Sequence, residues 1–237
     1  MERISLNSWQ LKLLAMATML VDHIGAILFP HLIFLRMVGR ISFPIFCFLL
    51  AEGVAHTSDR VRYLSRIVAF AVISEIPYNF VFFGSLFYPG SQNVLFELAL
   101  GVIGIILIEK IRIRVLGMLA ALLIAGFAWL FHVDYGAYGV LLMFLFYWGR
   151  ESSGQIRPAT LLVFLAFTLL YSLPSEILGR MGGLFAYSVQ SYAMFAAFPL
   201  ALYSGKRGPR RWKYFFYLFY PLHIFFFSIL KSVLYGF

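Results

Sequence analysis

The sequence has 237 residues, of which 62% are hydrophobic and 12% are charged. A water-soluble globular domain does not tolerate that composition, so the chain is predicted to be a polytopic membrane protein. The formal net charge of +9 could suggest a nucleic acid partner, but the basic residues lie in short loops between apolar segments, where membrane topology places them. We therefore expect a lipid bilayer around the protein and no nucleic acid. The single cysteine, Cys47, excludes an internal disulfide framework.

Apolar segments long enough to cross a bilayer recur along the chain. With about 20 residues for one crossing, the sequence predicts an all-α transmembrane bundle of about nine spans, within a range of roughly eight to ten. The expected spans are residues 11–29, 35–53, 67–83, 94–108, 115–131, 139–147, 158–173, 184–203 and 214–234. Little sequence remains for an extramembrane domain, so residues 1–237 are expected to form a single transmembrane domain.

Positive charges fall in every second connection between these spans. The positive-inside rule then places the N-terminus in the cytoplasm and the C-terminus outside. One of the basic connections carries Arg60, Arg62 and Arg66. These arginines are either topology signals alone or a site for phosphates, which arginine binds in a bidentate manner.

The first expected span carries Asp22 and His23 in its interior. Burying an Asp there costs about 2.5–3.5 kcal/mol, so such groups commonly face a cavity, a partner or a reaction. Lys12 precedes His23 by about three helical turns, which places both on one face roughly 16 Å apart. That geometry suits a ligand with an anionic head at the cytosolic surface and a reactive group on a long arm. Alternatively, Lys12 only reaches to the surface and His23 bonds to a neighbouring helix.

The second span begins with two arginines one turn apart. Arg40 is expected to pair with Asp22 or with a substrate carboxylate, with Asp22 the favoured partner, whereas Arg36 is expected to be an interfacial anchor. Pro44 follows inside the same span and frees backbone groups that need another partner.

The third and fourth spans also contain polar residues. Pro77 is expected to break the third span beside Glu75 and Asn79, and a broken helix with a buried acid favours a lined cavity. Asn93 and Glu97 share one face of the fourth span. They either line the same cavity or act only as a helix cap and an interfacial acid.

Two further segments add candidates. The outer loop that contains Asp134 and Tyr135 either meets an acceptor molecule or forms part of an interfacial aromatic belt. His223 in the last span is expected at nearly the depth of His23, which suggests a shared site. A metal would need a third donor that the sequence does not identify, so we expect no metal.

Several of these residues lie in recognisable motifs: Val21-Asp-His-Ile-Gly25, Gly39-Arg-Ile-Ser-Phe-Pro44, Leu50-Ala-Glu-Gly53, Ser74-Glu-Ile-Pro-Tyr-Asn79, Gln92-Asn93, Tyr135-Gly-Ala-Tyr-Gly139 and Tyr220-Pro-Leu-His223. As a set, spread over nearly the whole chain, they resemble the TraX family, whose founding member is linked to N-terminal acetylation of conjugative pilin. That family is similar to the transmembrane acyltransferases that modify sugars and peptidoglycan, in which a basic residue precedes a functional histidine as Lys12 precedes His23. Lysine stands here in place of the commoner arginine and lacks its bidentate fork.

The resemblance implies transfer of an acetyl group from cytosolic acetyl-CoA, in a bacterial plasma membrane. The acceptor would be a hydroxyl or amine of an exported peptide or glycan. The residues expected to bind acetyl-CoA are Lys12, Arg60, Arg62 and Arg66. The residues expected in catalysis are His23 as general base, with Asp22, Glu75 or His223 to orient it or relay a proton. The residues expected to bind the acceptor are Arg40, Asn79, Asn93, Glu97, Asp134 and Tyr135.

Three alternatives stay open at the sequence level. The acetyl group can pass directly to the acceptor or through an acetyl-histidine. The buried acids and histidines could instead form the relay of a proton-coupled transporter, although the paired half-repeats common in transporters are not visible here. A non-catalytic scaffold would leave the buried ionisable residues unexplained.

Overall fold

The computed structural model describes residues 5–111, 113–173, 189–209 and 213–235. Within these ranges, every regular element is helical. The chain divides into two compact units. Unit 1 comprises Met1–Phe46 and Gly149–Gly208, and unit 2 comprises Cys47–Trp148 and Pro209–Phe237.

Unit 1 begins with α1 (Ser8–His23), which continues as the π-helix η1 (Ile24–Leu28). Asn7 starts α1 with a capping box, in which its side chain accepts hydrogen bonds from two N–H groups of the first turn. The chain then forms α2 (Ile33–Gly39), which packs against α1, and begins α3 (Ser42–His56), which continues into unit 2.

The second half of unit 1 contains α8 (Pro158–Tyr171), the 3₁₀-helix η3 (Val189–Ala196) and the short α9 (Ala197–Ala201). Proline at the first position of α8 fits a helix start, where the missing N–H would have no partner in any case. The η3 helix contacts α2, α8 and α9. The predicted span 184–203 begins outside the described residues, and its described part is this 3₁₀-helix and α9 rather than one long α-helix.

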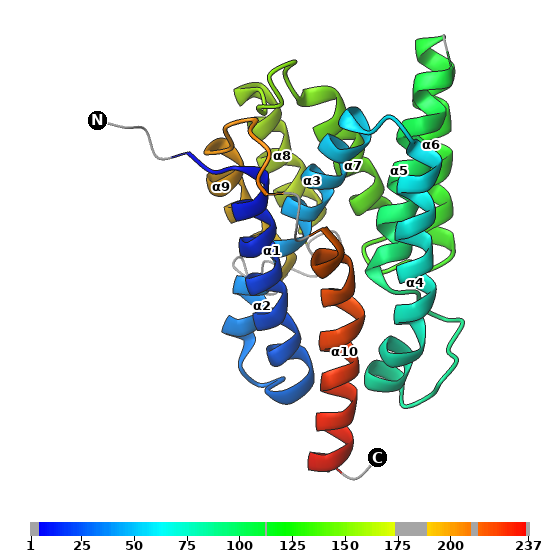
Figure 1. The fold of residues 1–237 in the computed structure, drawn as a ribbon, viewed down its shortest axis with the longest axis vertical. Helices are drawn as coiled ribbons and strands as arrows, with labels where there is room; N and C mark the ends of the chain where they lie inside the picture. The colour runs from blue at the N-terminus through cyan, green and yellow to red at the C-terminus, as the bar shows by residue number, and fades with distance from the viewer. Residues whose placement is uncertain (1–4, 112, 174–188, 210–212, 236–237) are drawn as a thin grey trace. The chain divides into compact units, whose positions relative to one another are not determined.

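Besides the end of α3, the described part of unit 2 contains α4 (Arg60–Phe83), α5 (Val94–Lys110), α6 (Arg114–Leu130), α7 (Ala137–Gly149) and α10 (Lys213–Tyr235). The α4, α5 and α6 helices follow one another side by side, and α10 packs along α4 (Figure 1). Short connections between antiparallel neighbours produce this arrangement.

Glycines allow α5 and α7 to approach closely. A Cβ atom at Gly101 would lie 2.2 Å from the sulfur of Met143, and one at Gly104 would lie 2.3 Å from the ring of Phe144. Small residues at helix contacts are a common device in membranes, where van der Waals packing rather than the hydrophobic effect holds helices together.

The outer surface is apolar in the manner of a membrane protein. Among the described residues, four helical stretches are long and apolar enough to cross a bilayer: Ser8–Leu28, Ile33–His56, Arg60–Phe83 and Phe215–Leu234. On the shorter α6, leucines such as Leu123 are largely exposed. The all-helical prediction is therefore confirmed, whereas nine crossings, a single domain and a cytoplasmic N-terminus stay predictions.

Two prolines behave differently from the sequence prediction. The predicted break at Pro77 is wrong, because α4 runs unbroken from Arg60 to Phe83. A helix tolerates one missing N–H when its neighbours pack on both sides. The second span instead divides near Arg40, between α2 and α3, so that Pro44 lies in the first turn of α3. Its missing N–H costs little there.

Candidate functional site

His23 occupies the end of α1 in unit 1. The α-helix is continuous from Lys12 to His23, so the predicted separation of about 16 Å along one face holds. The π-helix η1 starts at the next residue. Short π-helical turns occur frequently at functional sites, because the extra residue per turn redirects the side chains around it. His23 is half-buried at this junction.

Asp22 is bound by two arginines of unit 1. Its carboxylate lies 2.6 Å from the Arg40 Nη2 atom and 2.5 Å from the Arg36 Nη1 atom. Arg40 also donates from Nε, at 3.2 Å, which makes its contact a bidentate one. The predicted pairing of Asp22 with Arg40 is present.

Arg36 differs from its prediction as an interfacial anchor, because it shares the Asp22 carboxylate and also donates to the Asp22 carbonyl. Gly39 makes room for this ion pair, since a Cβ atom there would lie 2.2 Å from Asp22. The two positive charges and one negative charge are half-buried or buried. The sequence signal for this role was the spacing of Arg36 and Arg40, which places both on one helix face.

Glu75 and Asn93 meet in unit 2. The Asn93 Nδ2 group donates to both the Glu75 carboxylate and the Ala71 carbonyl, the latter at 2.9 Å. The Asn93 side-chain oxygen accepts from Leu95 N–H at 3.0 Å and so caps α5. Asn93 therefore fills both roles left open at the sequence level: it is a helix cap and a partner of Glu75.

Glu97 lies one turn after Asn93 and is fully buried. Its carboxylate faces the backbone N–H groups of Gly136 and Val140 and lies within electrostatic range of the Asp134 carboxylate. Within the described residues, neither of its oxygens makes a hydrogen bond of full geometry. A buried acid of this kind is costly unless a ligand or proton completes its surroundings.

Tyrosines surround these acids. Tyr78 on α4 is hydrogen-bonded to Ser91 at 3.4 Å and lies within electrostatic range of Glu75 and Asp134. Tyr220 on α10 lies within range of the same two acids. We call the set formed by Glu75, Tyr78, Asn93, Glu97, Asp134, Tyr135 and Tyr220 the acidic cluster.

Sequence reasoning identified the acids of this cluster but missed Tyr78 and Tyr220. Each lies in a motif that was interpreted through another residue. The surrounding residues of α4 and α10 are mostly apolar, so neither tyrosine was chosen as a site residue. Asn79 is one residue further along α4 and is buried, and its Oδ1 atom has no hydrogen-bond partner in the described structure.

His223 lies one turn beyond Tyr220 and is also buried. Its Nδ1 atom lies 2.7 Å from the Phe219 carbonyl, and its ring stacks on the ring of Phe219 at 4.6 Å. A carbonyl only accepts, so Nδ1 carries the proton and Nε2 is the basic nitrogen of the neutral ring. His23 and His223 belong to different units, and their shared site stays a prediction.

The three arginines predicted to bind phosphate begin α4. Arg60 is paired with Glu109, and Arg62 lies 3.3 Å from Asp59. The Arg66 guanidinium lies 6.0 Å from the ring centroids of Tyr63 and Tyr217. Phosphate binding by these residues stays a prediction.

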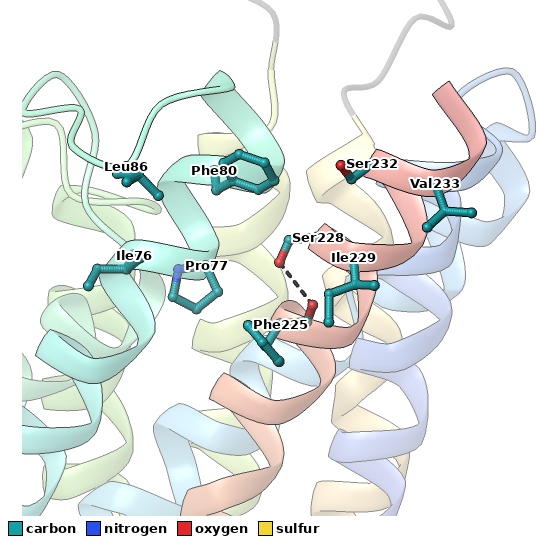
Figure 2. A pocket seen from close by; sticks show the side chains of 9 residues that line it. All are labelled: Ile76, Pro77, Phe80, Leu86, Phe225, Ser228, Ile229, Ser232 and Val233. Atoms are coloured by element: carbon teal, nitrogen blue, oxygen red, sulfur yellow. Dashed lines mark hydrogen bonds between the residues drawn. The ribbon is translucent and has the colours of Figure 1, made fainter. Parts of the chain in front are cut away.

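An apolar groove of about 320 Å³ lies between α4 and α10 (Figure 2). Its walls include Pro77 and Phe80 of α4 and Ile229 of α10. Ser228, which also lines it, donates its hydroxyl to the Ile224 and Phe225 carbonyls of its own helix. At about 100° per residue, this face of α4 points away from Glu75 and Asn79, so the groove is separate from the acidic cluster. In the described part of the chain, no three side chains are arranged to hold a metal.

One protein family and one known protein resemble this chain over nearly its whole length. The family described as TraX protein matches residues 7–231 of the chain. A probable fimbrial assembly protein FimC, serogroup H1, from Dichelobacter nodosus is 32% identical over 236 residues, which cover 93% of this chain and 94% of that protein. An uncharacterized protein of Rickettsia prowazekii is 35% identical over 91 residues, which cover 38% of this chain and 33% of that protein. No solved structure matches the chain.

Proposed function

Because the chain belongs to the TraX family, we propose that it is an integral-membrane acetyltransferase of the bacterial plasma membrane. The acetyl donor is cytosolic acetyl-CoA, and the acceptor is an exported or membrane-associated molecule. The observation that carries this proposal is the unbroken helix from Lys12 to His23, which becomes a π-helix directly after the histidine. A cation at one end of the helix face and a base about 16 Å away match a donor with a charged head and a reactive thioester.

His23 acts as the general base in this reaction. It takes the proton of the acceptor while the acceptor nitrogen or oxygen attacks the thioester carbonyl. The carbon–sulfur bond then breaks, and His23 returns the proton to the departing thiolate to give CoA and the acetylated acceptor. In the alternative order, His23 attacks the thioester first and the acetyl-histidine passes its acetyl group to the acceptor.

The acidic cluster binds the acceptor, and its chemistry favours an amine. Several buried oxygens in this region have no hydrogen-bond partner among the described residues: both carboxylate oxygens of Glu97, Asn79 Oδ1 and Gln92 Oε1. All of them are acceptors, so they suit a ligand rich in N–H donors. The relative named as a fimbrial assembly protein supports an exported pilus subunit as this ligand.

The test uses the purified full chain in lipid nanodiscs, with radiolabelled acetyl-CoA and a synthetic peptide that has a free N-terminus. We expect the wild type to label this peptide and to leave the same peptide with a blocked N-terminus unlabelled. His23→Ala should lower the rate by about 10²–10⁴-fold, the usual contribution of a general base. The matched control is His31→Ala, which removes an exposed histidine in the turn before α2 and should retain the wild-type rate.

Transfer by His23→Ala at the wild-type rate would remove His23 from the mechanism. A proton-coupled transporter is the second candidate, favoured by the buried Glu97, whose oxygens make no hydrogen bond of full geometry among the described residues. The competing experiment measures proton-driven uptake of the same synthetic peptide into proteoliposomes. Uptake that is lost in Glu97→Gln, together with no acetyl transfer by the wild type, would favour the transporter over the enzyme.

A further inference from the structure

Residues of α3, α4 and α10 place the side chain of Arg66 in an aromatic frame in unit 2. The Arg66 guanidinium lies 6.0 Å from the ring centroid of Tyr63 on α4, and at the same distance from that of Tyr217 on α10. The Tyr217 ring stacks in turn on the ring of Phe70, at 5.4 Å and 15°. Gly53 of α3 makes room for Tyr63, because a Cβ atom there would overlap the tyrosine hydroxyl. The position of this guanidinium therefore depends on side chains from several helices.

Arg66 differs from the other two arginines at the start of α4, because they have acidic partners. Arg60 is paired with Glu109, and Arg62 with Asp59. Among the described residues, no carboxylate is paired with Arg66, and its buried Nε–H group makes no hydrogen bond. The Arg66 guanidinium thus offers N–H donors for which this part of the chain supplies no acceptor.

The depth of Arg66 makes this arrangement costly. The residue is half-buried and lies about 9 Å along the helix axis from Arg60, inside the apolar stretch Arg60–Phe83. A charged side chain in a membrane span is unfavourable unless a partner or water reaches it, and such residues mark functional sites. Aromatic rings offset only part of that cost, because a ring offers a quadrupole rather than a full counter-charge. An anion bound to the guanidinium would offset the remainder.

Membrane topology alone does not account for the aromatic frame. The positive-inside rule requires only basic residues near the cytosolic surface, which Arg60 and Arg62 already provide. It does not require a guanidinium that is positioned by side chains of neighbouring helices. The planar fork of arginine donates two parallel hydrogen bonds to the oxygens of a phosphate or carboxylate, so a positioned and partly desolvated Arg66 suits an anion of this kind.

We propose that Arg66 binds a phosphate group of the acyl donor and that Tyr63 and Tyr217 position it for this contact. The inference rests on the proposed function, under which the donor is acetyl-CoA. It selects one of the three arginines of α4 that the sequence suggested for phosphate, and it leaves the other two to their acidic partners. It also gives the Leu50-Ala-Glu-Gly53 motif a role, because the glycine makes room for Tyr63. A lipid headgroup offers the same phosphate chemistry, and the experiment separates the two sources.

The first measurement is the affinity for CoA, determined by calorimetry with the purified full chain in nanodiscs of uncharged lipid. Arg66→Gln should raise the Kd by about 10-fold or more, as expected for the loss of a charge-assisted contact. The matched control is Lys110→Gln, which removes one exposed positive charge at the end of α5 and should leave the Kd unchanged.

Thermal unfolding separates binding from a structural role of Arg66. Without ligand, Arg66→Gln should unfold near the wild-type midpoint, because the substitution breaks no ion pair among the described residues. Saturating CoA should raise the midpoint of the wild type and leave that of Arg66→Gln nearly unchanged. A ligand-free variant that unfolds well below the wild type, and that CoA stabilises as much as the wild type, overturns the proposal and makes Arg66 a structural residue.

A second arm compares two donors in the acetyl-transfer assay. The drop in kcat/KM caused by Arg66→Gln should be at least about 10-fold larger with acetyl-CoA than with acetyl-pantetheine, which lacks the phosphates. A variant that is merely damaged loses activity with both donors alike. An equal drop with the two donors therefore overturns the proposal.

The remaining outcomes distinguish the site from the proposed function and from a lipid site. CoA binding by Arg66→Gln at wild-type affinity overturns the proposal, while acetyl transfer by the wild type would still support the enzyme. If phosphatidylglycerol in the nanodiscs stabilises the wild type but not Arg66→Gln, and CoA affinity is the same in both, the proposal is overturned and Arg66 is assigned to lipid. A wild type that neither binds CoA nor transfers acetyl groups overturns the proposed function itself.

Discussion

Replacing Asp22 with asparagine tests the ion pair that Asp22 forms with Arg36 and Arg40 in unit 1. The substitution keeps the side-chain shape but removes the negative charge that faces Arg36 and Arg40. The side chains of Asp22 and Arg40 are only 7% and 13% exposed, so neither charge has water to replace its partner. Arg36 is 32% exposed and will recover part of its hydration.

The expected loss follows from that burial. Removing one partner of a buried ion pair costs about 3–5 kcal/mol, because an uncompensated charge remains inside. For a chain of this size, about 2–4 °C accompany each kcal/mol, so the unfolding midpoint should fall by roughly 6–20 °C. Asp59→Asn is the matched control, since Asp59 pairs with Arg62 where the side chains are 49% and 76% exposed. An exposed pair is worth about 0–1 kcal/mol, so the control should shift the midpoint by less than about 4 °C.

The assay is thermal unfolding of the purified protein in detergent, followed by intrinsic tryptophan fluorescence and by retention of the protein in the size-exclusion peak of the unheated sample. Both variants lose one negative charge, so a general effect of net charge will appear equally in the two. If Asp22→Asn melts within about 2 °C of Asp59→Asn, the Asp22 pair is not buried as the structure has it, and the reasoning fails.

Two further substitutions test the packing and capping of unit 2. Gly104→Ala should cost about 1–3 kcal/mol because its new methyl group meets the Phe144 ring, whereas Gly126→Ala, with open space around it in α6, should be neutral or slightly stabilising. Equal melting temperatures for the two glycine variants would contradict the close approach of α5 to α7. Asn93→Ala should cost at least the roughly 0.5–2 kcal/mol of a helix cap and should also weaken acceptor binding, because Glu75 loses its partner. A raised KM for the peptide would show the second effect, and an unchanged KM with lowered stability would reduce Asn93 to a cap.

The helical content and the membrane character follow from composition and local pattern. Long apolar runs can satisfy their backbone hydrogen bonds in a bilayer only as helices or closed barrels, so the helical character of the chain was predictable without tertiary information. The helical spacing of Lys12 and His23 was equally predictable, because it depends only on the rise per residue of a continuous helix. The bonding of Asp22 to Arg40 was predictable for a related reason: a buried charge needs a counter-charge.

Tertiary structure decided which partners each polar group found. Pro77 was expected to break its helix, and only the helices packed around α4 let it continue. Arg36 became a partner of Asp22, as its spacing from Arg40 on one helix face allows, because Gly39 lets the two helices approach. The meeting of Glu75 with Asn93 joins residues of two helices that are 18 positions apart in the sequence. The sequence determined which polar and charged side chains need a partner inside the membrane. Tertiary packing determined which partner each of them finds, because the distances between helices depend on side chains from several segments at once.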